Sequence, residues 1–164
     1  MTDQATRNAL LGCIDGGQAS MTLDAAVADF PPEHYNTRPT NVPYSYWHLL
    51  EHIRICADDI VDYAIGDEYR VLKWPEECWP HPDAEADDAA WRATIDGIHR
   101  AMAALRQLVT DESCDLSRVA RHANDNAKHT LIREILVTTD HNAYHLGELA
   151  ILRQVMGLWP DGHA

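Results

Sequence analysis

Histidines are the residues whose number and spacing point most directly to chemistry in this chain. The sequence contains ten of them, and His141 and His145 stand four residues apart in the segment DHNAYHLGE. On a helix this spacing places both imidazoles on one face, one turn apart, as two ligands to one metal ion require. A second pair with the same spacing, His48 and His52, lies earlier in the chain. The sequence therefore holds two candidate helical ligand pairs.

The position of each histidine on its predicted helix indicates whether His48 or His52 is the better candidate for a metal ligand. Apolar residues around it recur at steps of three and four, and the centre of this stripe lies near Ile53. At about 100° per residue, His52 lies roughly 110° from the centre and His48 roughly 150°. We expect His52 at the edge of the buried face and His48 toward solvent. His52 with His141 and His145 would then hold a divalent ion and leave one coordination position open. From spacing alone, ordinary histidines at the edge of a core are the alternative.

Prolines divide the chain into stretches that can be helical. Seven of the eight prolines lie in residues 31–43 and 75–82, and no stretch shows the sustained alternation of a strand. The predicted fold class is all-α, a four-helix bundle with two long loops, in a single domain over residues 1–164. Ser45 is a suitable N-cap and Gly66 a suitable stop for the second helix. The helices are expected at residues 3–27 (weakened at Gly16 and Gly17), 45–65, 84–110 and 130–157, and the polar segment 111–128 is expected to be a loop with a short helical turn.

Composition narrows the class of protein. Thirteen basic and 26 acidic residues give a net charge of −13, which argues against nucleic acid or an anionic membrane as a partner. No apolar run approaches the ~20 residues of a membrane span. The opening residues MTDQATRNAL lack the pattern of a signal peptide, and we expect a cytoplasmic protein. The four cysteines form no CxxC pair, which predicts reduced thiols.

Two segments of the chain resemble the DinB/YfiT-like family. SYWHLLEHIRICADDIVDY resembles that family's second helix, and LIREILVTTDHNAYHLGELAILRQVMG resembles its last helix, with the motif H-x-x-x-H-x-G-Q/E. The resemblance covers most of the chain in order and spacing. It implies a four-helix bundle in which His52, His141 and His145 hold a divalent metal ion. Three-histidine sites accept several ions, and zinc or nickel is expected here.

Glu148 is the last residue of this motif, at a position where the family frequently has Gln. At about 100° per residue it falls close to the face of His141 and His145. We expect it to orient an imidazole, to act as a fourth ligand, or to accept a proton in catalysis. A plain surface carboxylate is the alternative. Gly147 costs the helix roughly 1 kcal/mol relative to Ala, which close approach of a neighbouring helix would explain.

The resemblance implies a metal-dependent hydrolase, or a transferase that moves a low-molecular-weight thiol such as bacillithiol or mycothiol to a small electrophile. A non-enzymatic metal- or small-molecule-binding module of a stress response is the alternative. A carboxylate-bridged di-iron bundle is set aside, because no Glu is followed three residues later by His. The nucleophile is expected to be external, because Cys56 lies on an apolar stripe. Trp74 and Trp79 are expected to roof a pocket above the metal or to cover a core.

A homodimer is also expected. The last predicted helix has apolar residues on more than one side, and such a helix is buried on several faces. The family resemblance implies the same assembly.

Overall fold

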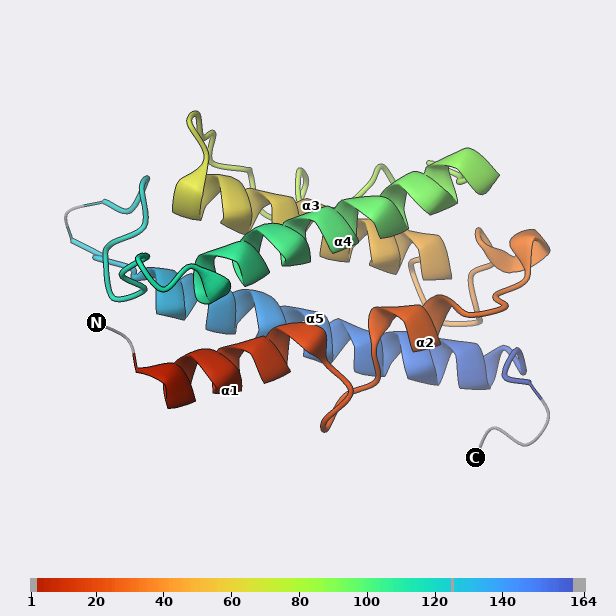
Figure 1. Cartoon of the computed structure of the whole chain (residues 1–164). Helices are drawn as coiled ribbons and strands as arrows, with labels where there is room; N and C mark the ends of the chain where they lie inside the picture. Colours follow the sequence, from red (N-terminus) through yellow and green to blue (C-terminus); the bar gives the residue numbers. More distant parts are fainter. Residues whose placement is uncertain (1–2, 125, 161–164) are drawn as a thin grey trace.

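The computed structural model describes residues 3–124 and 126–160, so the ends of the predicted domain, 1–2 and 161–164, lie outside the described residues. Four long helices lie side by side as a bundle (Figure 1), which confirms the all-α prediction. Within the described residues there is no strand, and the one extended pairing is an isolated bridge between Val119 and Thr130. The helices are α1 (Gln4–Asp15), α2 (Leu23–Val27), the 3-10 helix η1 (Pro32–His34), α3 (Tyr46–Ile65), α4 (Asp88–Thr110) and α5 (Leu131–Val155).

Capping side chains set where these helices begin. Ser45, Asp87 and Thr130 each accept a hydrogen bond from the backbone N–H three residues on, at the starts of α3, α4 and α5. The second predicted helix therefore starts and stops as expected, with Gly66 at its end. The third begins at Asp88 rather than near residue 84, because the capping aspartate at position 87 decides the start.

The prediction of one continuous helix over residues 3–27 is wrong. The first helix ends at Asp15, and Gly16 and Gly17 both take positive φ values of 68° and 74°, a region that L side chains rarely adopt. The chain then turns, and Thr22 caps the separate short helix α2. The segment 111–128 is a loop, as expected, but the short helical turn predicted within it is absent from its described residues, which form turns, bends and one bridge.

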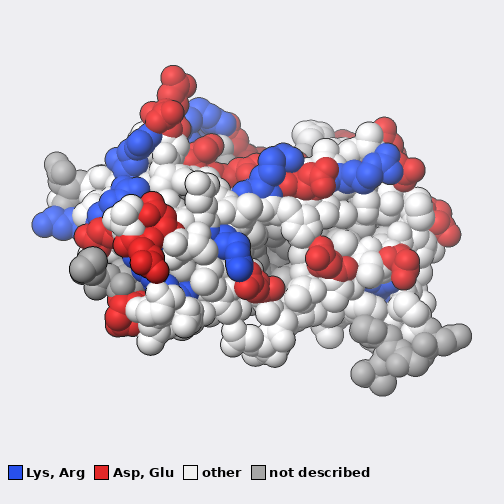
Figure 2. Space-filling view, viewed as in Figure 1, with Lys and Arg blue, Asp and Glu red and all other residues white. Residues whose placement is uncertain are grey.

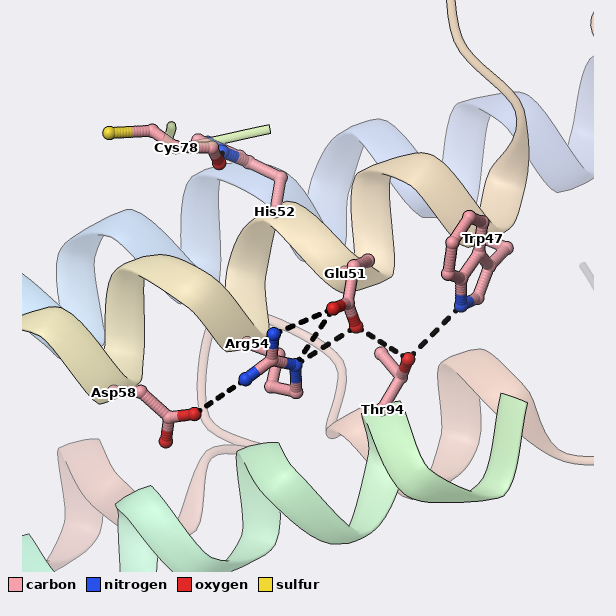
Figure 3. Close-up of polar contacts among 7 residues, drawn as sticks. All are labelled: Trp47, Glu51, His52, Arg54, Asp58, Cys78 and Thr94. Atoms are coloured by element: carbon pink, nitrogen blue, oxygen red, sulfur yellow. Dashed lines mark hydrogen bonds and ion pairs between the residues drawn. The ribbon is translucent and has the colours of Figure 1, made fainter. Parts of the chain in front are cut away.

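The long helix α3 packs against both α4 and α5. Between α3 and α4, Thr94 Oγ1 donates to Glu51, accepts from Trp47 Nε1, and so joins the two helices. Arg54 pairs with Glu51 and with Asp58 on the same side of α3. Figure 3 shows these contacts on the side of α3 that faces α4, while His52 leaves the helix in another direction. Adjacent residues of α3 thus serve helix packing on one side and the histidine cluster on the other.

Within the described residues, no helix combines the length and the apolar character that crossing a bilayer requires.

Candidate metal centre

Three histidines from two helices meet in the structure. His52 comes from α3, and His141 and His145 come from successive turns of α5. The Nε2 atoms of His52 and His141 lie 3.2 Å apart. One ring nitrogen from each of the three histidines can be chosen so that all lie within 4.8 Å of one another. The structure therefore brings together the three residues that the sequence singled out.

Hydrogen bonds at the far side of two rings set which nitrogen faces the cluster. His52 Nδ1 lies 2.6 Å from the carbonyl oxygen of Cys78, and His145 Nδ1 lies 2.6 Å from Glu148 Oε2. Both partners are acceptors, so each Nδ1 carries a hydrogen, and in the neutral ring Nε2 is then the nitrogen with the lone pair. His141 Nδ1 is buried and has no hydrogen-bond partner among the described residues. Outer-shell acceptors of this kind orient the imidazole ligands of metal sites.

The geometry and the protonation of the cluster both fit a divalent ion. Zinc–nitrogen bonds of about 2.0–2.1 Å in a tetrahedron separate two nitrogens by about 3.4 Å, close to the spacing of His52 and His141. Burial lowers the pKa of His52 to about 4, against 6.5 for an ordinary histidine. Burial, and then the neighbouring His145, lowers the pKa of His141. Neutral imidazole is the form that binds metals, so these two residues are ready to act as ligands.

The loop between α3 and α4 covers one side of the cluster. Trp79 stacks on the ring of His52, with centroids 3.9 Å apart and planes 4° from parallel. Trp74 is 70% exposed, and its ring centroid lies 6.4 Å from that of His52. Both tryptophans thus lie beside the cluster, Trp79 in close contact and Trp74 at its edge. The contribution of Cys78 was missed by the sequence analysis, because a backbone carbonyl leaves no signal in residue types.

The prediction that His48 points toward solvent is wrong. His48 is buried, its Nδ1 lies 2.6 Å from Ser45 Oγ, and its Nε2 lies 3.3 Å from the carbonyl oxygen of His81. The apolar stripe of α3 marks only the face that packs against other helices, whereas the loop carrying His81 covers a second face of α3. His48 still lies outside the cluster formed by His52 and its two partners.

Glu148 and Gly147 take different places beside the cluster. Glu148 bonds to His145 and so occupies the position expected of an orienting carboxylate. Burial, and then the charge of Glu148, raises the pKa of Tyr44, which places this tyrosine near the same carboxylate. A Cβ added at Gly147 would meet nothing within 4 Å. Close approach of another helix of the same chain therefore does not explain this glycine.

The fold and the cluster define a helical-bundle protein with a candidate three-histidine metal centre. The chain belongs to the DinB superfamily, whose family model matches residues 17–149. That range contains all three histidines and Glu148. Neither a curated protein nor a solved structure matches the chain.

Proposed function

We propose that the protein is a divalent-metal-dependent enzyme that acts on a small electrophile, either as a hydrolase or as a transferase of a low-molecular-weight thiol. The observation that carries this proposal is the convergence of His52, His141 and His145, two of them with Nδ1 already committed to an acceptor. A divalent ion held by three imidazoles supplies an open coordination position, where the pKa of a bound water or thiol is lowered.

The residues around the cluster have separable tasks in this proposal. The carbonyl oxygen of Cys78 accepts the Nδ1 hydrogen of His52. Glu148 Oε2 accepts the Nδ1 hydrogen of His145. Glu148 is half-buried, so its carboxylate also stands where it can accept a proton from an incoming nucleophile. Trp79 covers His52 and excludes water from that side.

An external nucleophile is favoured over a side chain of the protein. The thiol of Cys56 lies beside the cluster, with Sγ 3.6 Å from His52 Nδ1. Burial raises the pKa of its thiol to about 12, so almost no thiolate is present at neutral pH. Water, or a thiol such as bacillithiol or mycothiol, is therefore the proposed nucleophile.

The second candidate is a cytoplasmic binding module without turnover, in which the same histidines hold a metal or a small molecule. The stacking of Trp79 on His52 favours this binding module, because that contact closes one approach to the cluster.

Exposed apolar residues on α5 support the proposal that the protein works as a homodimer, whether it is an enzyme or a binding module. Tyr144, Ile151 and Val155 are 65%, 64% and 67% exposed.

One experiment separates the two candidates. The purified protein is stripped with a chelator, reloaded with zinc or nickel, and tested for hydrolysis and for thiol consumption with small electrophiles. Metal-dependent turnover that is lost in His52→Ala and His145→Ala supports the enzyme. Stoichiometric metal binding with no turnover on any electrophile supports the binding module. Full turnover in the stripped protein contradicts the proposed metal-dependent enzyme.

A further inference from the structure

Two of the four cysteines lie together beside the histidine cluster. Cys56 stands on α3, one turn after His52, and Cys78 stands on the loop between α3 and α4. Both cysteines are free, and their thiols are hydrogen-bonded to each other. Figure 3 shows the Cys78 thiol directed away from the His52 ring, toward the end of α3 at which Asp58 lies. The fold thus pairs two thiols that come from different parts of the chain.

The position of Cys78 is fixed by its backbone and by its neighbour. Its carbonyl oxygen accepts from His52 Nδ1, and its N–H donates to the carbonyl oxygen of Pro75 at 3.1 Å. The next residue, Trp79, stacks on His52. Cys56 Sγ in turn lies 3.6 Å from His52 Nδ1. A ligand that joins the two sulfurs therefore meets a pair that is already in place, so little ordering entropy is lost on binding.

The environment of this thiol pair favours coordination over redox chemistry. Burial raises the pKa of both thiols, to about 12 for Cys56. Peroxides and disulfides react with the thiolate form, so the pair is poorly reactive toward such oxidants. A bound metal ion, by contrast, deprotonates the thiol that coordinates it. Cys56 is half-buried, so a small ion can reach the pair from its side.

The number of available ligands selects the class of metal ion. Among the described residues, the three histidines are the only group of three or more possible ligands that lie close enough together for one ion. The thiol pair therefore supplies two ligands and no third. Zinc takes four ligands in structural sites and three from the protein in catalytic sites. Cu(I) is selected by soft thiolate ligands and is stable between two of them, so the pair fits Cu(I) better than zinc.

The charge of the protein favours the approach of a cation. The net charge is −13, and Figure 2 shows acidic side chains spread across the face seen in Figure 1. A surface of this sign raises the local concentration of cations. Closer to the pair, burial and then nearby charges, that of Asp59 included, disfavour free thiolates. A cation held between the two sulfurs reduces this repulsion.

We propose that Cys56 and Cys78 form a second metal site, which binds one Cu(I) ion between their two sulfurs. Two S–H bonds break and two Cu–S bonds form. The two hydrogens leave to solvent as protons, and the oxidation state of copper does not change. The site adjoins the histidine cluster but shares no ligand with it, so it does not depend on the metal chemistry proposed above.

Competition with a coloured Cu(I) chelator tests the proposal on the full chain. The zinc-loaded protein, in oxygen-free buffer with ascorbate as reductant, is titrated with the Cu(I)–bicinchoninate complex, whose colour falls as copper is withdrawn. We expect one Cu(I) to bind per chain. X-ray absorption of the copper-loaded, unaltered chain should show two sulfur neighbours, a result that needs no variant. Imidazole nitrogens as the neighbours would place the copper at the histidines and would overturn the proposal.

Serine variants show which thiols are responsible. Cys56→Ser and Cys78→Ser keep the size of the side chain, and each should lose more copper affinity than the about 10–100-fold that an outer-shell partner contributes. Cys13→Ser on α1 and Cys114→Ser, in the loop after α4, are matched controls and should bind copper as the unaltered chain does. His141→Ala should also keep the copper, which separates this site from the histidine cluster.

Thermal melts establish that each variant is folded. If the unaltered chain withdraws no copper from the chelator, the proposal is wrong, whatever the histidines bind. Unchanged affinity in both variants of the thiol pair, or an equal loss in the two control variants, would also overturn it.

Discussion

The Nε2 atoms of His52 and His141 lie 3.2 Å apart, although the two residues are 89 positions apart in the chain. The hydrogen of His52 is committed to the Cys78 carbonyl, so its Nε2 presents a lone pair toward His141. Burial keeps both rings neutral by lowering their pKa values. A divalent cation between the two nitrogens would satisfy both lone pairs, and His145 adds a third.

The first prediction concerns the ligands. The protein should bind one zinc or nickel ion per chain, and His52→Ala and His145→Ala should each lose more affinity than the about 10–100-fold typical of an outer-shell partner. Mass spectrometry of metal content after dialysis against a graded chelator measures this. His48→Gln is the matched control on α3, because His48 lies outside the cluster. If His48→Gln loses the metal while His52→Ala keeps it, the assignment is wrong.

Glu148 is predicted to act on turnover more than on folding. Glu148→Ala should stay folded and mostly metal-bound, yet lose about tenfold or more in turnover, because His145 loses its orienting acceptor. Glu148→Gln keeps an oxygen that can accept from His145 Nδ1, so it should restore metal affinity but not the part of turnover that requires a carboxylate as proton acceptor. Glu112→Ala, exposed in a loop, serves as the control. Unchanged turnover in both Glu148 variants would assign this residue to the surface.

Acid should destabilise the metal-free protein through His52. An ordinary histidine takes up a proton near pH 6.5, whereas folded His52 does so only near its pKa of about 4. Between these values the unfolded chain binds more protons, so the free energy of unfolding falls as the pH is lowered. Urea titrations with chelator present, from pH 7 to 4, measure this loss. His52→Leu should show a shallower dependence, and an equal slope in both proteins would exclude His52 as its source.

Two glycines should respond in opposite ways to alanine. A Cβ at Gly97 would lie 2.5 Å from Arg54 Cδ and 2.7 Å from its Cγ, and the guanidinium of Arg54 is held by Glu51 and Asp58. Gly97→Ala should therefore lower the free energy of unfolding by about 1–3 kcal/mol, as overpacking does. Gly147→Ala meets open space and should raise the stability of the monomer by up to about 1 kcal/mol. Chemical denaturation of both variants decides, and a stabilised Gly97→Ala would contradict the packing described for α3 and α4.

The exposed apolar face of α5 is predicted to form the homodimer. Sedimentation at micromolar concentration should give a dimer, with an interface on the order of 1,600 Å² or more. Ile151→Asp should shift it to monomer, because the new charge would be buried in the interface. Ala93→Asp, exposed on α4, should leave the dimer intact. A monomer in the unaltered protein would refute this assembly.

Local signals in the sequence were enough to place the helices that carry the site. Ser45 marks the start of α3 and Gly66 marks its end. The four-residue spacing puts His141 and His145 on one face of α5. Both features follow from the sequence because capping and helix periodicity depend only on near neighbours. Helix angles selected His52 from the earlier pair, the resemblance to the family's two helical motifs implied the same ligand, and the structure brings all three histidines together. The break of the first helix was visible as two glycines, but their backbone conformation was not.

Tertiary structure decided what surrounds the histidines. The burial of His48, the bond from His52 to the Cys78 carbonyl and the stacking of Trp79 all arise from the loop that folds back over α3. A loop without periodicity gives no sign of where it will pack, and a backbone carbonyl is the same at every position. The pairing of the Cys56 and Cys78 thiols likewise exists only once this loop lies on α3. Helix periodicity is local, whereas the environment of a buried polar atom is set by contacts between distant parts of the chain.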